Sequence, residues 1–262
     1  MNLGLKGKVA IVMAASKGLG KASARALAME GANVVIGARD EKILQETAKQ
    51  LREESKSNIL AIPTDVMNPA DLKRVVEETV KEFGKIDILV NNAGGPPPGT
   101  FETLTDEQWQ QTFELTFLSV VRTIRLVLPH MKKTGSGRII NMTGSAVKQP
   151  VENLLLSNAI RPGVVGLAKS LANELAAEKI TVNNIVTGYF LTDRVNKLYK
   201  IEEKLKQGFS EEEAVANRGI PMKRFGKPEE FGALVAFLAS DQAAYITGTS
   251  IQIDGGLTRS IF

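Results

Sequence analysis

Short apolar segments alternate with amphipathic stretches along the whole chain, and this alternation constrains the fold more than any other feature. Near-continuous apolar character is typical of strands that are covered on both faces, as in a parallel sheet. We therefore expect parallel strands at residues 8–13, 33–38, 59–62, 86–91, 138–142, 181–186 and 250–253.

The stretches between these segments show helical periodicity. We expect helices at residues 18–30, 41–56, 69–83, 106–133, 162–178 and 228–240. A regular strand–helix alternation predicts an α/β fold: a doubly wound parallel sheet of about seven strands with helices on both faces. No linker-like stretch and no internal repeat divides the chain, so residues 1–262 are expected to form a single domain.

Composition excludes several kinds of site. The chain has no cysteine, which rules out disulfides, thiolate catalysis and cysteine-based metal sites. Its one histidine, His130, follows Pro129 near the end of an expected helix and is predicted to be a surface residue. A histidine-rich metal site or a Ser-His-Asp triad is therefore implausible, and we expect no bound metal.

The charge pattern favours a solvated surface over a nucleic-acid interface. The net charge is +4, but basic residues alternate with acidic ones, as where Arg52 and Lys56 flank Glu53 and Glu54. Nucleic-acid binding is the weaker alternative.

The apolar run at 9–15 reads as a buried strand rather than a signal peptide, and nothing approaches the ~18 apolar residues of a membrane span. We expect a cytoplasmic protein without nucleic-acid or membrane partners.

A glycine-containing loop follows the first expected strand and leads directly into a helix. Its residues are Ala14, Ser16, Lys17, Gly18, Leu19 and Gly20. Glycines let the backbone approach a pyrophosphate, and a helix N-terminus offers it free N–H groups and positive dipole charge. The placement between strand and helix predicts a dinucleotide site.

At these residues the chain resembles the short-chain dehydrogenase/reductase family, in particular its 3-oxoacyl-carrier-protein-reductase-like members. The family pattern T-G-x-x-x-G-x-G stands here as Met13-Ala14-x-x-x-Gly18-x-Gly20, with Ala14 replacing the first glycine. The resemblance covers essentially the whole chain and implies a Rossmann-type fold. Its further motifs are Asp65-Val66, Asn91-Asn92-Ala93-Gly94, Arg224-x-Gly226-x-Pro228-Glu229, Ile246-Thr247-Gly248 and Asp254-Gly255-Gly256.

The resemblance also implies contacts for the rest of the cofactor. Asp65 and Val66 would contact the adenine; Asn92, Ala93 and Gly94 would line the adenosine ribose; Gly188, Phe190 and Thr192 would contact the nicotinamide. Arg39 ends the second strand where NAD-preferring relatives carry an acidic residue. With Lys17 it favours NADP(H) over NAD(H), because a guanidinium pairs well with a phosphate. The alternative is that Arg39 pairs with Asp40 or Glu41 on the surface.

The residues that carry catalysis in this family are all substituted. The family uses a Tyr as acid, a Lys four residues later, a Ser thirteen residues before the Tyr, and an upstream Asn. Flanking residues place Arg161 at the Lys position, Ser157 at the Tyr position, Gly144 at the Ser position and Thr116 at the Asn position. A one-residue slip would bring Ser145 into the Ser role.

Two features near these positions leave alternatives open. Pro162 disfavours helical geometry at Arg161, which puts the stacking of Ser157 on Arg161 in doubt. Tyr189 is either a relocated acid or, as we favour, a packing residue. The insertion at 193–218 covers the substrate in relatives, and its apolar residues suit either a hydrophobic substrate or simple packing. They are Val195, Leu198, Tyr199, Ile201, Leu205 and Phe209.

The leading hypothesis is an NADP(H)-dependent oxidoreductase that acts on an unknown carbonyl or alcohol substrate through an atypical site, with Ser145, Ser157 and Arg161 as its candidate catalytic residues. The alternative is an NADP(H)-binding sensor or scaffold protein without turnover. Helices 106–133 and 162–178 form a symmetric interface in related proteins, which implies a homo-oligomer, with a tetramer favoured.

Overall fold

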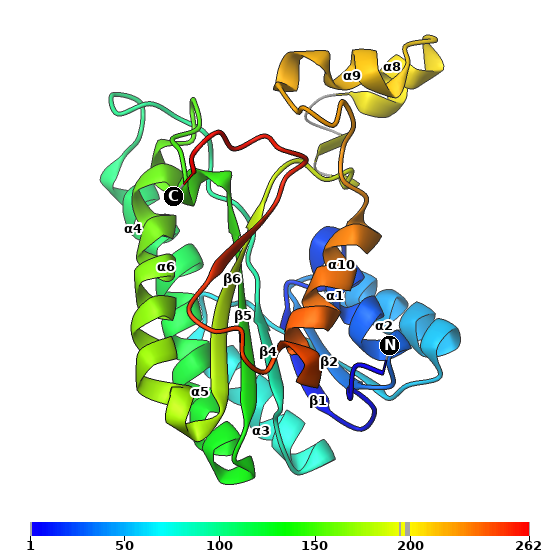
Figure 1. Cartoon of the computed structure of the whole chain (residues 1–262), viewed down its shortest axis with the longest axis vertical. Helices are drawn as coiled ribbons and strands as arrows, with labels where there is room; N and C mark the ends of the chain where they lie inside the picture. The colour runs from blue at the N-terminus through cyan, green and yellow to red at the C-terminus, as the bar shows by residue number, and fades with distance from the viewer. Residues whose placement is uncertain (1, 194, 197–199, 262) are drawn as a thin grey trace.

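The computed structural model describes residues 2–193, 195–196 and 200–261, and its centre is a seven-stranded sheet of parallel strands (Figure 1). The strand order is β3-β2-β1-β4-β5-β6-β7, so the order reverses between β1 and β4. This confirms the doubly wound α/β fold. The strands are β1 Val9–Met13, β2 Asn33–Ala38, β3 Ile59–Pro63, β4 Ile88–Asn91, β5 Gly137–Gly144, β6 Ile180–Thr187 and β7 Ser250–Ile253.

Helices cover both faces of the sheet, in two separate apolar layers. One layer packs α1, α2 and α10 around a cluster that includes Leu27, Leu44 and Phe231. The other packs α3, α5 and α6 around Leu72, Val127 and Ala168. Both layers are visible in Figure 1, on opposite sides of the strands. The helices of the two layers are α1 Gly18–Met29, α2 Glu41–Ser55, α3 Pro69–Phe83, α5 Ser119–Thr134, α6 Leu155–Leu175 and α10 Pro228–Ala239.

The single helix expected at 106–133 is interrupted. The structure has α4 Asp106–Phe113, a π-helical turn at Glu114–Leu118, and then α5. A π turn is a single wide turn inside a helix that continues on both sides, so the helical character of the whole segment does not reveal it. His130, expected at the surface, is half-buried on α5.

The expectation that a helix begins near Pro162 is wrong. Helix α6 begins at Leu155 and passes through Pro162 without interruption. Its buried face, which includes Leu156, Val164 and Ala168, packs on the sheet, and this tertiary packing outweighs the local cost of an interior proline. Ser157 and Arg161 therefore lie on one continuous helix, four residues apart and on the same face.

The insertion at 193–218 includes the short helices α8 Ile201–Lys206 and α9 Glu211–Val215, which lie beyond the two helical layers in Figure 1. Ile201, Ala214 and Val215 form a small cluster with Ile220 and Phe225. The predicted apolar inner face is only partly right, because Leu205 and Phe209 are exposed. Leu198 and Tyr199 lie outside the described residues.

A row of amide side chains crosses the buried half of the sheet. The Asn91 Nδ2 donates to Asn141 Oδ1 at 2.9 Å, Asn141 Nδ2 donates to Asn184 Oδ1 at 3.1 Å, and Asn184 Nδ2 donates to Ser250 Oγ at 3.2 Å. These residues are register partners on β4, β5, β6 and β7. Because an unpaired buried amide is costly, the row fixes the register of four strands.

Asn141→Leu removes the middle member of this row. The Asn91 donor and the Asn184 acceptor both lose their partner in the interior, so we expect a loss of about 2–5 kcal/mol in the free energy of unfolding. Urea unfolding followed by circular dichroism measures it. The matched control is Asn58→Leu, since Asn58 makes its amide bond to Asn33 at the exposed surface; its effect should stay within about 0.5 kcal/mol. Equal effects of the two substitutions would contradict the role of the row.

Candidate functional site

One cleft of about 830 Å³ lies at the carboxyl ends of the central strands. It is lined by the glycine loop after β1, by the loops after β4, β5 and β6, and by one face of α6. Ligands of doubly wound sheets bind at this edge, where the strand order reverses. The predicted site residues found in its lining are Ala14, Lys17, Gly18, Leu19, Gly20, Asn92, Ala93, Gly94, Ser145, Ser157, Arg161, Gly188, Phe190 and Thr192.

The glycine loop is shaped for close approach of a ligand. Ala14 has a left-handed backbone with φ of +49°, the conformation for which the family's first glycine is suited. A Cβ at Gly20 would lie 2.3 Å from the Ala14 carbonyl oxygen, so only glycine fits there. Asn92 also donates to that carbonyl, at 3.3 Å, and thereby ties the loop after β4 to the loop after β1.

Helix α1 begins at Gly18 and no side chain caps its N-terminus. Its first N–H groups therefore remain available to a ligand anion, and the dipole places positive charge beside them. This open end, together with the missing Cβ at Gly20, fits the pyrophosphate of a dinucleotide.

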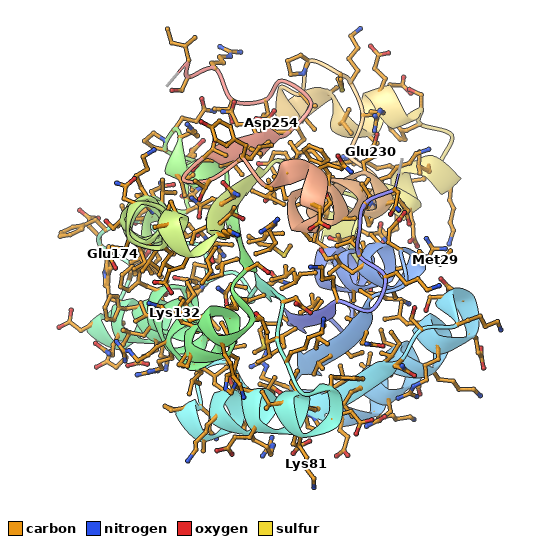
Figure 2. All side chains as sticks on the ribbon, turned by 60° about the horizontal axis from the view of Figure 1, so that its bottom comes forward. Met29, Lys81, Lys132, Glu174, Glu230 and Asp254 are labelled. Atoms are coloured by element: carbon orange, nitrogen blue, oxygen red, sulfur yellow. The ribbon has the colours of Figure 1, made fainter. Side chains whose placement is uncertain are left out.

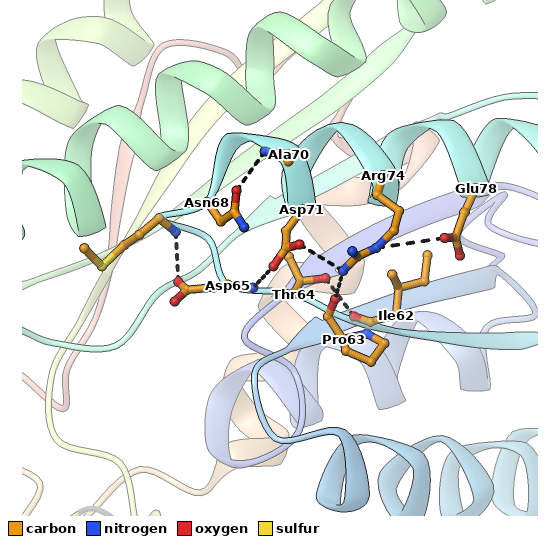
Figure 3. A network of polar contacts seen from close by, with 10 residues as sticks. Ile62, Pro63, Thr64, Asp65, Asn68, Ala70, Asp71, Arg74 and Glu78 are labelled. Atoms are coloured by element: carbon orange, nitrogen blue, oxygen red, sulfur yellow. Dashed lines mark hydrogen bonds and ion pairs between the residues drawn. The ribbon is translucent and has the colours of Figure 1, made fainter.

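The loop after β3 is held by a polar network (Figure 3). Arg74 donates to the Pro63 carbonyl and pairs with Asp71, and Asp71 in turn accepts from the Asp65 backbone N–H at 2.9 Å. The Asp65 side chain accepts from the Met67 N–H at 3.0 Å. The network positions Asp65 and Val66 at the edge of the sheet next to β2, outside the lining of the main cleft.

Arg39 and Lys17 stand on this same side of the site. Arg39 follows β2 and is exposed, and Lys17, also exposed, precedes α1. Within the described part of the chain the Arg39 side chain makes no hydrogen bond or ion pair, so the surface pairing with Asp40 or Glu41 does not form. Ser16, between strand and helix, accepts from Thr47 Oγ1 through its carbonyl at 2.8 Å.

Helix α6 and the loop after β5 bring the candidate catalytic residues into the same cleft. Ser157 is buried, and Arg161 lies one turn further along, where its Nη1 donates to the Met142 carbonyl at 3.4 Å. Ser145 begins the turn after β5 and also lines the cleft. Ser145, Ser157 and Arg161 therefore all line one space.

The other hydroxyls near the family's catalytic positions are turned away. Thr143 Oγ1 donates to the Ile185 carbonyl at 3.0 Å inside the sheet, although the residue lines the cleft. Thr116, which was expected at the family's Asn position, lies in the π-helical turn and donates to the Thr112 carbonyl at 2.8 Å. Neither is placed to hold a substrate oxygen.

The segment after β6 forms the opposite wall. A Cβ at Gly188 would lie 2.6 Å from Asp254 Cα, so this position requires glycine. The Phe190 ring is buried against Phe231, with ring centroids 5.5 Å apart and the planes nearly perpendicular. Thr192 accepts from the Val195 N–H at 3.4 Å and lies beside Gly18, where it links the base of the insertion to the glycine loop.

Tyr189 lies between this cleft and a second cavity of about 360 Å³. Its ring packs against the cluster around Ile201 and Ile220. Charged side chains line the second cavity. Figure 2 shows two of these residues, Glu230 and Asp254, at the same end of the molecule. Glu230 makes a bidentate pair with Arg224, at 2.7 and 2.8 Å.

Comparison with known proteins agrees with this geometry. A family model described as Enoyl-(Acyl carrier protein) reductase matches residues 13–258. The 3-oxoacyl-[acyl-carrier-protein] reductase FabG of Vibrio cholerae is 37% identical over 97% of this chain and 99% of its own. The chain belongs to the short-chain dehydrogenase/reductase family.

Two solved members of the family are similar throughout. L-sorbose reductase from Gluconobacter frateurii, complexed with NADPH and L-sorbose, has a TM-score of 0.93 and 34% identity, with both chains fully covered. A short chain oxidoreductase from Pseudomonas aeruginosa PAO1, NADPH-bound and containing an atypical catalytic center, has a TM-score of 0.90 and 31% identity over 96% of this chain and 97% of that one.

Several cleft residues of this family member were not found by sequence reasoning. They come from the loops at the carboxyl ends of β4, β5 and β6, and their position after an apolar strand was the one available signal. They are Gly95, Pro96, Met142, Ala146, Val151, Leu154 and Thr187.

Within the described residues no group of three or more His, Cys, Asp or Glu side chains could hold a metal ion, and no helix is long and apolar enough to cross a membrane.

The ion pair at the start of α10 predicts a pH dependence. Hydrogen bonds from the Arg224 side chain and then from the Lys227 N–H lower the pKa of Glu230 from 4.5 to about 2. A carboxyl with a lowered pKa in the folded state stabilises the fold above its ordinary value, and that contribution is lost as the pH falls through about 2. Wild type should therefore exceed Glu230→Gln in free energy of unfolding near neutral pH, and the difference should shrink below pH 4.5. Urea titrations across this range measure it. Glu229→Gln, at an exposed neighbouring position, should show no such pH dependence.

Proposed function

We propose that this protein is an NADP(H)-dependent oxidoreductase of the short-chain dehydrogenase/reductase type whose atypical site uses Ser145, Ser157 and Arg161. The observation that carries the proposal is that a single cleft joins the glycine loop to these three side chains. Support comes from the NADPH-bound relatives, one of which contains an atypical catalytic center.

Each part of the cleft has a task in this proposal. The α1 N-terminus and Gly20 receive the pyrophosphate. Asn92, Ala93 and Gly94 in the cleft, together with Asp65 and Val66 outside its lining, hold the adenosine half. Gly188, Phe190 and Thr192 hold the nicotinamide, which supplies a hydride when bound. Arg161 binds its ribose and contributes positive charge, while the Ser145 and Ser157 hydroxyls donate to the substrate oxygen. The insertion at 193–218 covers the substrate.

Arg39→Ala tests the choice of cofactor. A charge-assisted bond from Arg39 to the 2′-phosphate is worth roughly 1.5–3 kcal/mol, which is about ten- to over a hundredfold in NADPH affinity. NADH lacks that phosphate, and its affinity should hardly change. Fluorescence titration of both cofactors measures the two effects.

Arg125→Ala serves as the matched control, since Arg125 is exposed on α5 outside the cleft and should leave both affinities unchanged. Equal weakening of NADPH and NADH by Arg39→Ala would refute the NADP(H) preference. Tight NADPH binding with no turnover of any acceptor would instead favour a sensor or scaffold.

We also propose that the chain assembles as a homotetramer with two-fold axes. Helices α4, α5 and α6, which correspond to the interface helices of related proteins, present Phe113 at 38% exposure, and Tyr245 near the start of β7 is fully exposed. Light scattering at micromolar concentration should give four times the 28.3 kDa chain mass. A monomeric mass would contradict this assembly.

A further inference from the structure

The cleft contains few side chains that could donate a proton. Reduction of a simple carbonyl leaves an alkoxide, which needs a proton as it forms. The titratable side chains in the cleft lining, within the described part of the chain, are Lys17, Arg161, Tyr189 and Asp193.

Two of these four, Lys17 and Asp193, are exposed at the rim of the cleft, and the third, Tyr189, has a ring that is packed elsewhere. Lys17 lies exposed at the start of α1, where the pyrophosphate is expected, and Asp193 is exposed at the base of the insertion. Tyr189 packs its ring against the Ile201 and Ile220 cluster and borders the second cavity. Only Arg161 shares the α6 face with Ser157.

Arg161 and Ser157 are suited to hold a negative charge but not to neutralise it. A guanidinium keeps its proton in proteins, and a serine hydroxyl without an adjacent base is a very weak acid. Both donate hydrogen bonds, and the half-buried setting of Arg161 strengthens its attraction for an anion. Arg161 and Ser157 are therefore suited to bind an oxyanion, and neither of them is a general acid.

We propose that the acceptors are conjugated carbonyl compounds, such as enones, in which hydride addition leaves a delocalised and weakly basic oxyanion held by Arg161 and Ser157. This inference rests on the proposed function and specifies its substrate class. Such an oxyanion persists long enough to take its proton from water, so the missing acid does not limit the reaction.

The step balances in atoms and electrons. Hydride, a hydrogen with two electrons, adds to the β-carbon of the acceptor while the nicotinamide that supplied it is left oxidised. The C=C π bond breaks, its electron pair forms the new C=C bond toward the carbonyl carbon, and the C=O π pair moves onto the oxygen. A proton from water then adds to the α-carbon, which gives the saturated carbonyl compound.

The walls of the cleft fit a flat apolar acceptor. Pro96 is buried, and the following prolines end at Gly99, which pairs with Leu154 in an isolated parallel bridge. The Gly99 N–H donates to the Asn153 carbonyl at 2.8 Å, so two loops form one fixed wall. Further apolar side chains line the same space: Ala146, Val151 and Val195.

A binding measurement tests the oxyanion site without turnover. The probe is 4-nitrophenol, whose phenolate is a delocalised oxyanion with its own absorbance. We expect the NADP⁺-loaded protein to prefer the phenolate over the phenol by about tenfold or more, seen as a pKa of the bound probe about one unit below its value in solution. Arg161→Met should abolish the shift and Arg161→Lys should restore part of it. Arg125→Met, outside the cleft, should leave it unchanged. An unshifted bound probe in the wild type would overturn the proposal.

A matched pair of acceptors tests the substrate class. With NADPH as donor, kcat/KM for 2-cyclohexenone should exceed that for cyclohexanone by about 10²–10⁴, the usual worth of a general acid. Equal rates would overturn the inference while leaving the oxidoreductase intact, and loss of both rates in Tyr189→Phe would then identify the acid. No turnover of either acceptor, with NADPH bound, would overturn the proposed function itself.

Discussion

The parallel direction of all seven strands is the constraint on which the rest of the structure depends. Because every strand ends at the same edge, the loops after β1, β4, β5 and β6 meet although they are far apart in sequence. In one of these contacts the Ala14 carbonyl lies against Gly20 and accepts a hydrogen bond from Asn92. This contact leaves no room for a side chain at Gly20. The dinucleotide site is therefore a consequence of how the sheet is packed.

The same arrangement separates the support of the site from the side chains that the site presents. Helix α6 carries Ser157 and Arg161, and its place is set by its buried apolar face rather than by those two residues. The side chains at these two positions decide the chemistry of the cleft, while the buried face of α6 decides where its wall stands. Function in such a fold is decided by a few side chains on a fixed support.

The sequence predicted the sheet, the glycine loop and part of the lining of the main cleft, because apolar periodicity and the placement of Gly18 and Gly20 both depend on short-range patterns. It failed where tertiary packing outweighs a local preference, as at Pro162 inside α6. It also failed at Glu114–Leu118, where a single π turn lies within a segment that is otherwise α-helical. The direction of the Thr143 hydroxyl could not be predicted, because it is set by a hydrogen bond to the Ile185 carbonyl on the neighbouring strand.

The amide row across β4 to β7 has a direction. Each Nδ2 group donates toward the next strand, from Asn91 to Asn141, to Asn184 and finally to Ser250, so the side-chain dipoles align and polarise one another. One member cannot reverse its amide without placing two acceptors or two donors face to face. Local opening of a single strand is thereby coupled to its neighbours, and the backbone amides of this half of the sheet should exchange with solvent as one cooperative unit.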